Sequence, residues 1–492
     1  MLLDSRARFM NSAATNLYSA QLPGSSLILE GVSPMSSRLP IVLIHGYSDH
    51  GKSFQRWVAL LRARGYDPTL IHIADYQTLT NEITIKDLAE GLDRALHDEA
   101  RLKDGQPFDA IVHSTGMLVI RSWLVTYADR RQRLKHLIGL APATFGSPLA
   151  HKGRSWLGAI FKGNKTLGPD FMEAGNGVLD GLELASAFTW DLAHRDLIGD
   201  TTFYGPTKRT PYPFVFCGTN DYGGLRRLIN EDGTDGTVRW AGCSLDTRKI
   251  TLDFTRNPRI KTDRDRLQLG HAENLETMPV TLMPGLNHTT ILSDPSPDLV
   301  DLVTHALEVE SLADFEVWRR AAAKIHTKAA GEVDQWQQFI VRALDERGDP
   351  ITDYNVQLFS VEHGKKTRVH RNFAIDVHAY REDSSLRCFH VKISDRDLKE
   401  LPNLWAQVIA STGSTWVGYY SAHPDLLGQG EADEERGTVQ IQLDLSRMIR
   451  RTSPIKFFYP FTTTLIELRL DREPLPLTKP NKLFRFASSS LP

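Results

Sequence analysis

The sequence has few cysteines, little net charge and no long hydrophobic run. Its three cysteines, Cys217, Cys243 and Cys388, are too few for a disulfide framework. The formal net charge is −2, which gives no electrostatic reason to expect a nucleic-acid partner. No run of eighteen apolar residues occurs, and the N-terminus lacks the apolar segment of an ordinary signal peptide. We therefore expect no transmembrane segment and a protein that is cytoplasmic, or exported without a cleaved signal peptide.

Metal-binding patterns are also missing. The 17 histidines are scattered without a repeated ligand spacing, and no acidic cluster requires calcium. We expect no metal and no cofactor. Cys217 and Cys243 are expected to be small buried thiols, with a disulfide between them as the alternative.

The length and composition predict two globular domains. A chain of 492 residues is too long for one ordinary core, and its 41% hydrophobic and 24% charged residues are typical of a globular protein. Residues 1–38 are polar and Ser-rich and are expected to form a short lead-in strand or arm. Residues 1–312 are assigned to the first domain.

In the first domain, apolar strands alternate with helical patterns. Strands are predicted at 40–44, 68–73, 108–113, 137–141, 213–217 and 279–283, with helices at 53–64, 85–102, 116–128 and 296–309. Strands that are apolar on both faces and separated by helices indicate a mostly parallel α/β sheet. Catalytic residues should then lie in loops at the carboxyl ends of the strands.

Residues 144–210 interrupt this alternation with a long segment rich in glycine and aromatic residues. We interpret the segment as a cap or lid over an apolar pocket that could touch a lipid surface transiently. Within it, Phe188 and Trp190 are candidates for the substrate pocket. The alternative is that the segment is a helical excursion that packs on the core.

The pattern changes after a predicted connector helix at 313–332. Residues 333–476 contain short runs bounded by turn residues, and Val439, Ile441, Leu443 and Leu445 alternate with polar residues. Antiparallel strands at these spacings predict a C-terminal all-β, sandwich-like domain. Residues 477–492 are expected to form a tail.

The candidate nucleophile is Ser114, in the segment His113-Ser-Thr-Gly116 between the strand at 108–113 and the following helix. A serine on a sharp strand-to-helix turn presents its hydroxyl to substrate, and the helix N-terminus favours the charge that develops. The alternative is a serine that only caps the helix.

The candidate base is His288, in a loop between a strand and the closing helix; His271, in a charged loop, and His305, within a helix, fit less well. A serine hydroxyl needs such a base, and a carboxylate to orient it.

The candidate acid is Asp235, in the short turn Asp232-Gly-Thr-Asp-Gly-Thr-Val238, with Asp221 and Asp232 as alternatives. Backbone N–H groups of Tyr47 and Thr115 are the expected oxyanion-hole donors, because Gly46 permits a close approach of the chain and Thr115 follows the nucleophile.

Together these segments resemble the α/β-hydrolase superfamily, and its lipase and esterase members in particular. Ile44-His-Gly-Tyr47 is similar to the lipase oxyanion motif, and Val112-His-Ser-Thr-Gly116 to the nucleophile elbow. The segment Asp235-Gly-Thr-Val238 is similar to the acid segment of lecithin–cholesterol acyltransferase-like lipases and phospholipases. The departure is Val112, where the usual elbow has glycine. The resemblance spans about residues 38–310.

The residues and the resemblance imply a serine carboxylic-ester hydrolase that works through an acyl-enzyme on lipid or other apolar esters. A phospholipase is an alternative, given the acid segment. A different class of alternative is a non-catalytic binding protein on a hydrolase scaffold, in which the C-terminal β domain carries the function.

Overall fold

The structure is a computed structural model that describes most of residues 38–474. Besides single residues and pairs, the ranges outside the description are 1–37, 47–50, 77–79, 99–101, 151–175, 199–202, 206–210, 224–229, 256–266, 270–277, 369–374, 394–403, 421–430, 434–437, 445–457 and 475–492. The predicted N-terminal arm, the predicted tail and much of the predicted cap therefore lie outside the described residues.

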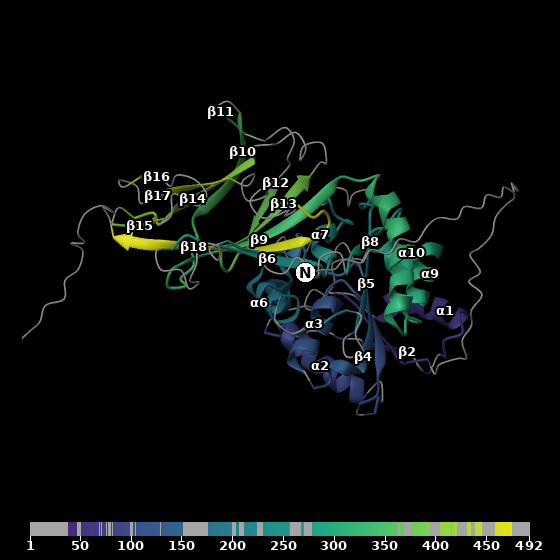
Figure 1. The fold of residues 1–492 in the computed structure, drawn as a ribbon. Helices are drawn as coiled ribbons and strands as arrows, with labels where there is room; N and C mark the ends of the chain where they lie inside the picture. The colour runs from purple at the N-terminus through teal and green to yellow at the C-terminus, as the bar shows by residue number, and fades with distance from the viewer. Residues whose placement is uncertain are drawn as a thin grey trace, which may run out of the picture. The chain divides into compact units, whose positions relative to one another are not determined.

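A six-stranded, wholly parallel sheet forms the first layer of the fold (Figure 1). Its strands, in the spatial order β2-β1-β3-β4-β5-β8, are β2 (Ile71–Ala74), β1 (Ile41–Ile44), β3 (Phe108–His113), β4 (Leu134–Leu140), β5 (Tyr212–Gly218) and β8 (Val280–Met283). Every residue of β1 and β3 is buried, as the apolar runs predicted. The predicted α/β fold with a mostly parallel sheet is confirmed.

Helices cover both faces of this sheet. They are α1 (Gln55–Ala63), α2 (Ile85–Asp98), α3 (Gly116–Thr126), α5 (Asn176–Leu182), α6 (Ala187–Asp196), α7 (Trp240–Cys243), α8 (Thr290–Ser293), α9 (Pro297–Ala306) and α10 (Leu312–Ala330), with 3₁₀ turns at Gly51–Phe54 and Arg131–Arg133. Helices α1, α9 and α10 lie on one side of the sheet, and α2, α3 and α6 lie on the other (Figure 1). Because apolar residues cover both faces, the strands read as continuous hydrophobic runs.

Helix α10, predicted as a connector, is part of the α/β layer. It packs on β8 and α9. Trp318 lies edge-on to Phe214 with 4.6 Å between ring centroids, and its indole N–H donates to the Leu302 carbonyl at 2.9 Å. The helix therefore completes the cover of the parallel sheet.

Two further sheets follow. The larger, mixed sheet has the order β12-β13-β9-β18-β6-β7, with β15 also paired to β18. Its strands are β6 (Thr247–Asp253), β7 (Leu267–Leu269), β9 (Gln335–Asp345), β12 (Ile375–Ala379), β13 (Leu386–Ile393), β15 (Val417–Tyr420) and β18 (Thr463–Pro474). The smaller, antiparallel sheet consists of β10 (Tyr354–Glu362), β11 (Lys365–Arg368), β14 (Leu404–Ser411), β16 (Glu431–Asp433) and β17 (Thr438–Asp444).

The mixed sheet differs from the predicted all-antiparallel domain. Strand β18 pairs in parallel with β9 on one side and with β6 on the other, so Ile466 stands opposite both Val341 and Ile250. Strands β6 and β7 come from the segment assigned to the first domain. One sheet therefore crosses the boundary predicted near residue 333, and the described residues from 39 onward form one compact unit.

The mixed sheet is apolar on both faces. Phe339 and Val341 of β9 share a core with residues of the small sheet. Between them, Ile340 points to the opposite face and shares a core with Phe145 and Trp190 of the α/β region. The mixed sheet is thus the middle layer between the small sheet and the α/β region.

Candidate active site

Ser114 lies at a strained turn between β3 and α3. Its φ is +51°, in the left-handed region that costs a non-glycine residue energy, and it is buried. Its N–H donates to the Leu140 carbonyl at 3.3 Å, and its carbonyl accepts from the Ala143 N–H at 3.0 Å. The N-cap of α3 is Thr115, without a side-chain cap bond. Helix capping therefore does not account for Ser114.

The loop after β1 lies directly against this serine. A Cβ on Gly46 would sit 2.7 Å from Ser114 Cβ and 3.3 Å from Ser114 Oγ. A Cβ on Gly116 would sit 2.6 Å from the Ile44 carbonyl oxygen. Both glycines thus allow the close approach that the predicted oxyanion loop requires. Thr115 lies at the start of α3, and Tyr47 is outside the described residues, so the oxyanion hole remains a prediction.

His45 supports the same loop and was not among the predicted site residues. Its Nε2 accepts the Tyr76 backbone N–H at 3.1 Å, and its ring stacks on the Tyr76 ring at 4.4 Å. Because Nε2 is the acceptor, Nδ1 carries the proton and donates to the Gly46 carbonyl at 2.7 Å. The ring therefore fixes the direction of the Gly46 carbonyl.

Val112 departs from the usual elbow without blocking it. It is fully buried in β3 and stands opposite Ile44 of β1 and Gly139 of β4. A Cβ on Gly139 would lie 2.8 Å from the terminal methyl of Met117. The small residue that lets α3 pack closely is therefore on the neighbouring strand.

Asp235 and His288 meet as predicted for an acid and a base. Both are fully buried, and His288 Nδ1 lies 2.9 Å from Asp235 Oδ2. The other carboxylate oxygen accepts the backbone N–H groups of Thr237 at 3.0 Å and Val238 at 2.9 Å. The backbone N–H of His288 also donates to the backbone carbonyl of Asp235 at 3.0 Å. These bonds hold the carboxylate in one orientation against the imidazole.

The alternative acid and base candidates that the structure describes do not share the burial of Asp235 and His288. Asp221 and Asp232 are exposed, and His305 is exposed on α9. His271 lies outside the described residues.

His113 joins the serine turn to the base loop. Its Nε2 donates to the His288 carbonyl at 3.1 Å, and the two rings lie 4.6 Å apart. Burial, and then the nearby His288, lower the pKa of His113 well below its usual value, so this ring is neutral. The structure thus places the base loop beside the residue that precedes Ser114.

Arg239 is a buried residue of the acid loop that the sequence did not single out. Its guanidinium bonds to Asp376 of β12, lies 3.3 Å from Glu231, and donates to Cys388 Sγ of β13 at 3.3 Å. In the same loop, a Cβ on Gly233 would lie 2.7 Å from both His390 and Trp336. The mixed sheet therefore packs directly on the loop that carries Asp235.

A second buried ion pair fixes the helix behind Ser114. Arg121 of α3 binds both carboxylate oxygens of Asp196 on α6, at 2.8 and 2.9 Å, and the Tyr204 hydroxyl donates to the same carboxylate at 2.8 Å. Burial alone would lower the pKa of Arg121, but the Asp196 charge raises it above the ordinary value. The pair holds α3 against α6.

Cys217 and Cys243 are free thiols rather than a disulfide. Their sulfur atoms lie 3.5 Å apart, and Cys217 Sγ is 3.7 Å from Asp235 Oδ2. Burial raises the pKa of both thiols. They form part of the packing around the acid.

The two pocket candidates lie on α6. Trp190 is buried in the core shared with the mixed sheet, and its ring lies 4.8 Å from that of His194. Phe188 is half-buried against the core of the α/β region. These contacts give Trp190 a packing role, while a role in substrate binding stays a prediction for both.

Within the described part of the chain, no three His, Cys, Asp or Glu side chains are grouped as a metal site would need. None of the helices described is both long and apolar enough to cross a membrane.

Among solved structures, two of phospholipase PlaB from Legionella pneumophila resemble this chain. One has a TM-score of 0.71 and the other, in complex with thio-NAD, a TM-score of 0.69; each is 21% identical and covers 92% of this chain and 98% of PlaB. Lipase B from Aspergillus fumigatus matches at a TM-score of 0.33 and 12% identity, over 60% of this chain and 63% of the lipase. No family model and no curated protein matches the sequence. The parallel sheet and the PlaB match show that the chain has the α/β-hydrolase fold, extended by a second region of β-sheet.

Proposed function

We propose that this protein is a serine hydrolase that cleaves carboxylic esters of phospholipids. The observation that supports the proposal is the buried Asp235–His288 pair, whose loop is bonded through the His288 carbonyl to His113, the residue before the strained Ser114. Helix capping does not explain the conformation of Ser114, because the N-cap of α3 is Thr115. The strained serine and the buried pair match the needs of a nucleophile that depends on an oriented base.

In the proposed reaction, Ser114 Oγ attacks the ester carbonyl while His288 takes the hydroxyl proton. The Ser114 oxygen bonds to the acyl carbon, and the ester C–O bond breaks as His288 returns the proton to the leaving alcohol. Water, activated by the same imidazole, then releases the carboxylic acid. Asp235 holds the imidazole and stabilises its charged form. The N–H groups of Thr115 and Tyr47 are the proposed donors to the oxyanion.

The comparison with PlaB supports the choice of a phospholipid over other esters. PlaB, whose structure this chain resembles over 92% of its length, is a phospholipase. The similarity extends beyond the α/β region, so it includes the added β-sheets as well. This favours a phospholipid substrate over a triacylglycerol or a small soluble ester.

The test uses the full chain, a Ser114→Ala variant and Ser293→Ala as the matched control, since Ser293 is exposed on α8. We expect fluorophosphonate labelling and phosphatidylcholine hydrolysis for the natural chain and the control, and neither for Ser114→Ala. Assays on p-nitrophenyl acetate and palmitate separate the ester classes.

Full activity of Ser114→Ala would contradict the mechanism. Hydrolysis of p-nitrophenyl esters without hydrolysis of phosphatidylcholine would leave an ester hydrolase but reject the phospholipid. Absence of both labelling and hydrolysis in the natural chain would favour the non-catalytic binding protein.

A further inference from the structure

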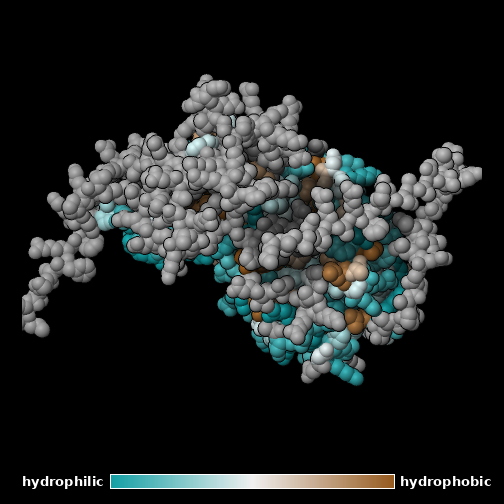
Figure 2. All heavy atoms as spheres, viewed as in Figure 1, coloured by the Kyte–Doolittle hydropathy of each residue, from teal (hydrophilic) through white to brown (hydrophobic). Residues whose placement is uncertain are grey.

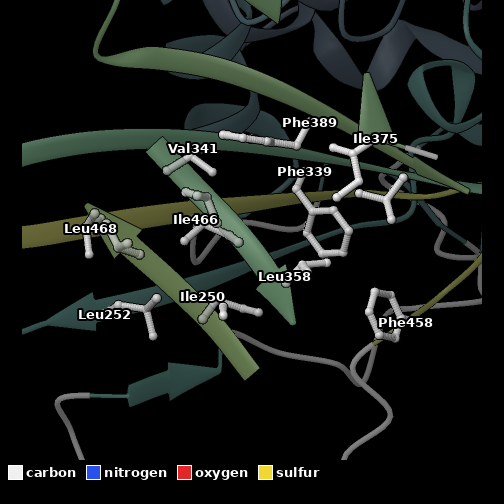
Figure 3. Close-up of a pocket in the computed structure, with 14 residues that line it drawn as sticks. Ile250, Leu252, Phe339, Val341, Leu358, Ile375, Phe389, Phe458, Ile466 and Leu468 are labelled. Carbon is white, nitrogen blue, oxygen red and sulfur yellow. The ribbon is translucent and has the colours of Figure 1, made fainter. Parts of the chain in front are cut away.

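A polar atom directly beside Ser114 is buried without a hydrogen bond. In the described part of the chain, His113 Nδ1 has no hydrogen-bond partner. The apolar features of the molecule need no polar contact: exposed hydrophobic residues of the described chain form small separate groups in Figure 2, and the side chains lining the space between the mixed and small sheets are all apolar (Figure 3). A buried polar atom that lacks a partner is rare in native proteins and calls for an explanation.

The two ring nitrogens of His113 face two different loops. Nε2 donates to the His288 carbonyl at 3.1 Å, so the neutral ring carries a lone pair on Nδ1. Nδ1 faces the loop after β1, because a Cβ on Gly46 would sit 3.2 Å from it and 3.3 Å from Ser114 Oγ. The His113 ring therefore lies between the loop that carries the candidate base and the loop after β1.

The bond from His113 holds His288 on the side that the acid does not hold. The backbone N–H of His288 donates to the Asp235 carbonyl at 3.0 Å, and His288 Nδ1 lies 2.9 Å from Asp235 Oδ2. Both of these bonds attach the base to the acid loop. The bond to the His288 carbonyl attaches it to the serine turn instead. Without that bond, the base could pivot away from the serine while its contact with the acid stayed intact.

The same bond acts on the strained turn. The φ of +51° at Ser114 can persist only where the surroundings hold it. Main-chain bonds to Leu140 and Ala143 hold the turn from β4 and the segment that follows it. His113 adds a link from the turn to the base loop, so that the nucleophile and the base are held relative to each other.

We propose that His113 is a positioning residue, which keeps His288 within reach of the Ser114 hydroxyl and spaces the base loop from the loop after β1. The role rests on the proposed function. His113 acts through His288 and exchanges no proton itself.

The test compares His113→Gln with His113→Met in the full chain. The two side chains have the same length and no charge, but only glutamine carries an N–H that can replace the Nε2 donor. His305→Met makes the same change at an exposed histidine of α9 and is the matched control. Ser114→Ala reports on the proposed function itself. Steady-state kinetics on a soluble p-nitrophenyl ester, the rate of fluorophosphonate labelling and urea unfolding are measured for each variant.

We expect His113→Met to lower kcat by about tenfold or more with little change in KM, because a small displacement of the base costs the reaction that much. Fluorophosphonate labelling should slow by the same factor, since it uses the same base. His113→Gln should keep kcat within about threefold of the natural chain, because it restores the donor. His305→Met should behave like the natural chain. If His113→Met does not fold, His113→Asn replaces it, because its shorter amide reaches the position of Nδ1 but not that of Nε2.

The outcomes separate the two proposals. Full activity of Ser114→Ala would reject the proposed function, and with it any part of His113 in the reaction. If Ser114→Ala is inactive but folded His113→Met keeps the natural kcat, only the positioning role is wrong. Equal losses of kcat in His113→Gln and His113→Met would also overturn it, because the donor would then make no difference.

Discussion

Gly46→Ala is the most direct perturbation of the proposed site. The added Cβ would lie 2.7 Å from Ser114 Cβ, whereas ordinary contacts begin at 3.4 Å. The loop or the serine must therefore move by about 0.7 Å, the difference of these two distances. A displacement near 1 Å costs a reaction roughly a hundredfold, and losing one oxyanion donor costs about 10²–10³-fold. We expect kcat/KM to fall about a hundredfold, or ~2.7 kcal/mol of transition-state stabilisation.

The control is the same substitution at Gly91. This residue is exposed within α2, and a Cβ there would meet nothing within 4 Å. Replacing a helical glycine by alanine should raise the free energy of unfolding by about 1 kcal/mol. Activity of this variant should equal that of the natural chain.

The assay is initial-rate kinetics on a soluble p-nitrophenyl ester, with urea unfolding of each variant. Urea unfolding shows whether lost activity comes from a displaced loop or from unfolding of the whole protein. Gly46→Ala should show its loss of activity at urea concentrations where it is still folded. If folded Gly46→Ala keeps the full kcat/KM, the loop after β1 takes no part in catalysis and the reasoning fails.

Four other outcomes follow from buried groups. Arg239→Gln should lower kcat more than it changes KM in ester assays, because it loosens the acid loop; an unchanged kcat would contradict this. Asp196→Ala should lower the free energy of unfolding in urea by about 3–5 kcal/mol, because Arg121 would stay buried without its partner; a loss below 1 kcal/mol would contradict it. Burial lowers the pKa of His390 well below 6.5, so the unfolded chain takes up a proton that the folded chain does not. Stability should therefore fall as pH drops below about 6.5, by at most ~1.4 kcal/mol per pH unit for this group, and His390→Gln should make the fall shallower. Iodoacetamide should label no buried thiol in the folded protein, seen by mass spectrometry, and should label three after unfolding: Cys217, Cys243 and Cys388.

The parts of the site that could be predicted are those that depend on local sequence patterns. The strand at Phe108–His113 was predicted with its exact bounds because an apolar run ends at a polar turn. His288 was selected because it occupies a loop just past a strand, and Asp235 because it lies in a short polar turn with two glycines that can hold a carboxylate against an imidazole. Their hydrogen bond then follows from the parallel sheet rather than from proximity in sequence.

The partners of the C-terminal strands were not predictable in the same way. A strand's alternation shows which residues share a face but does not identify the neighbouring strand. Strand β18 therefore gave no sign that it lies parallel to β9 and β6. Arg239 was missed for a related reason, because its partner Asp376 lies 137 positions away.

These long-range contacts bear on what the added β-sheets do. If they were an independent module, their contacts with the α/β region would be peripheral and replaceable. Instead, His390 and Trp336 lie where a side chain on Gly233 would have to be, two residues before Asp235. The hydroxyl of Thr463 on β18 donates to the Ala241 carbonyl at 2.9 Å, just beyond the acid loop. A chain ending at residue 312 would lack the strands that cover the loop around Gly233 and Ala241. Arg239 would also lose its ion pair with Asp376. The added sheets therefore support the loop that carries Asp235.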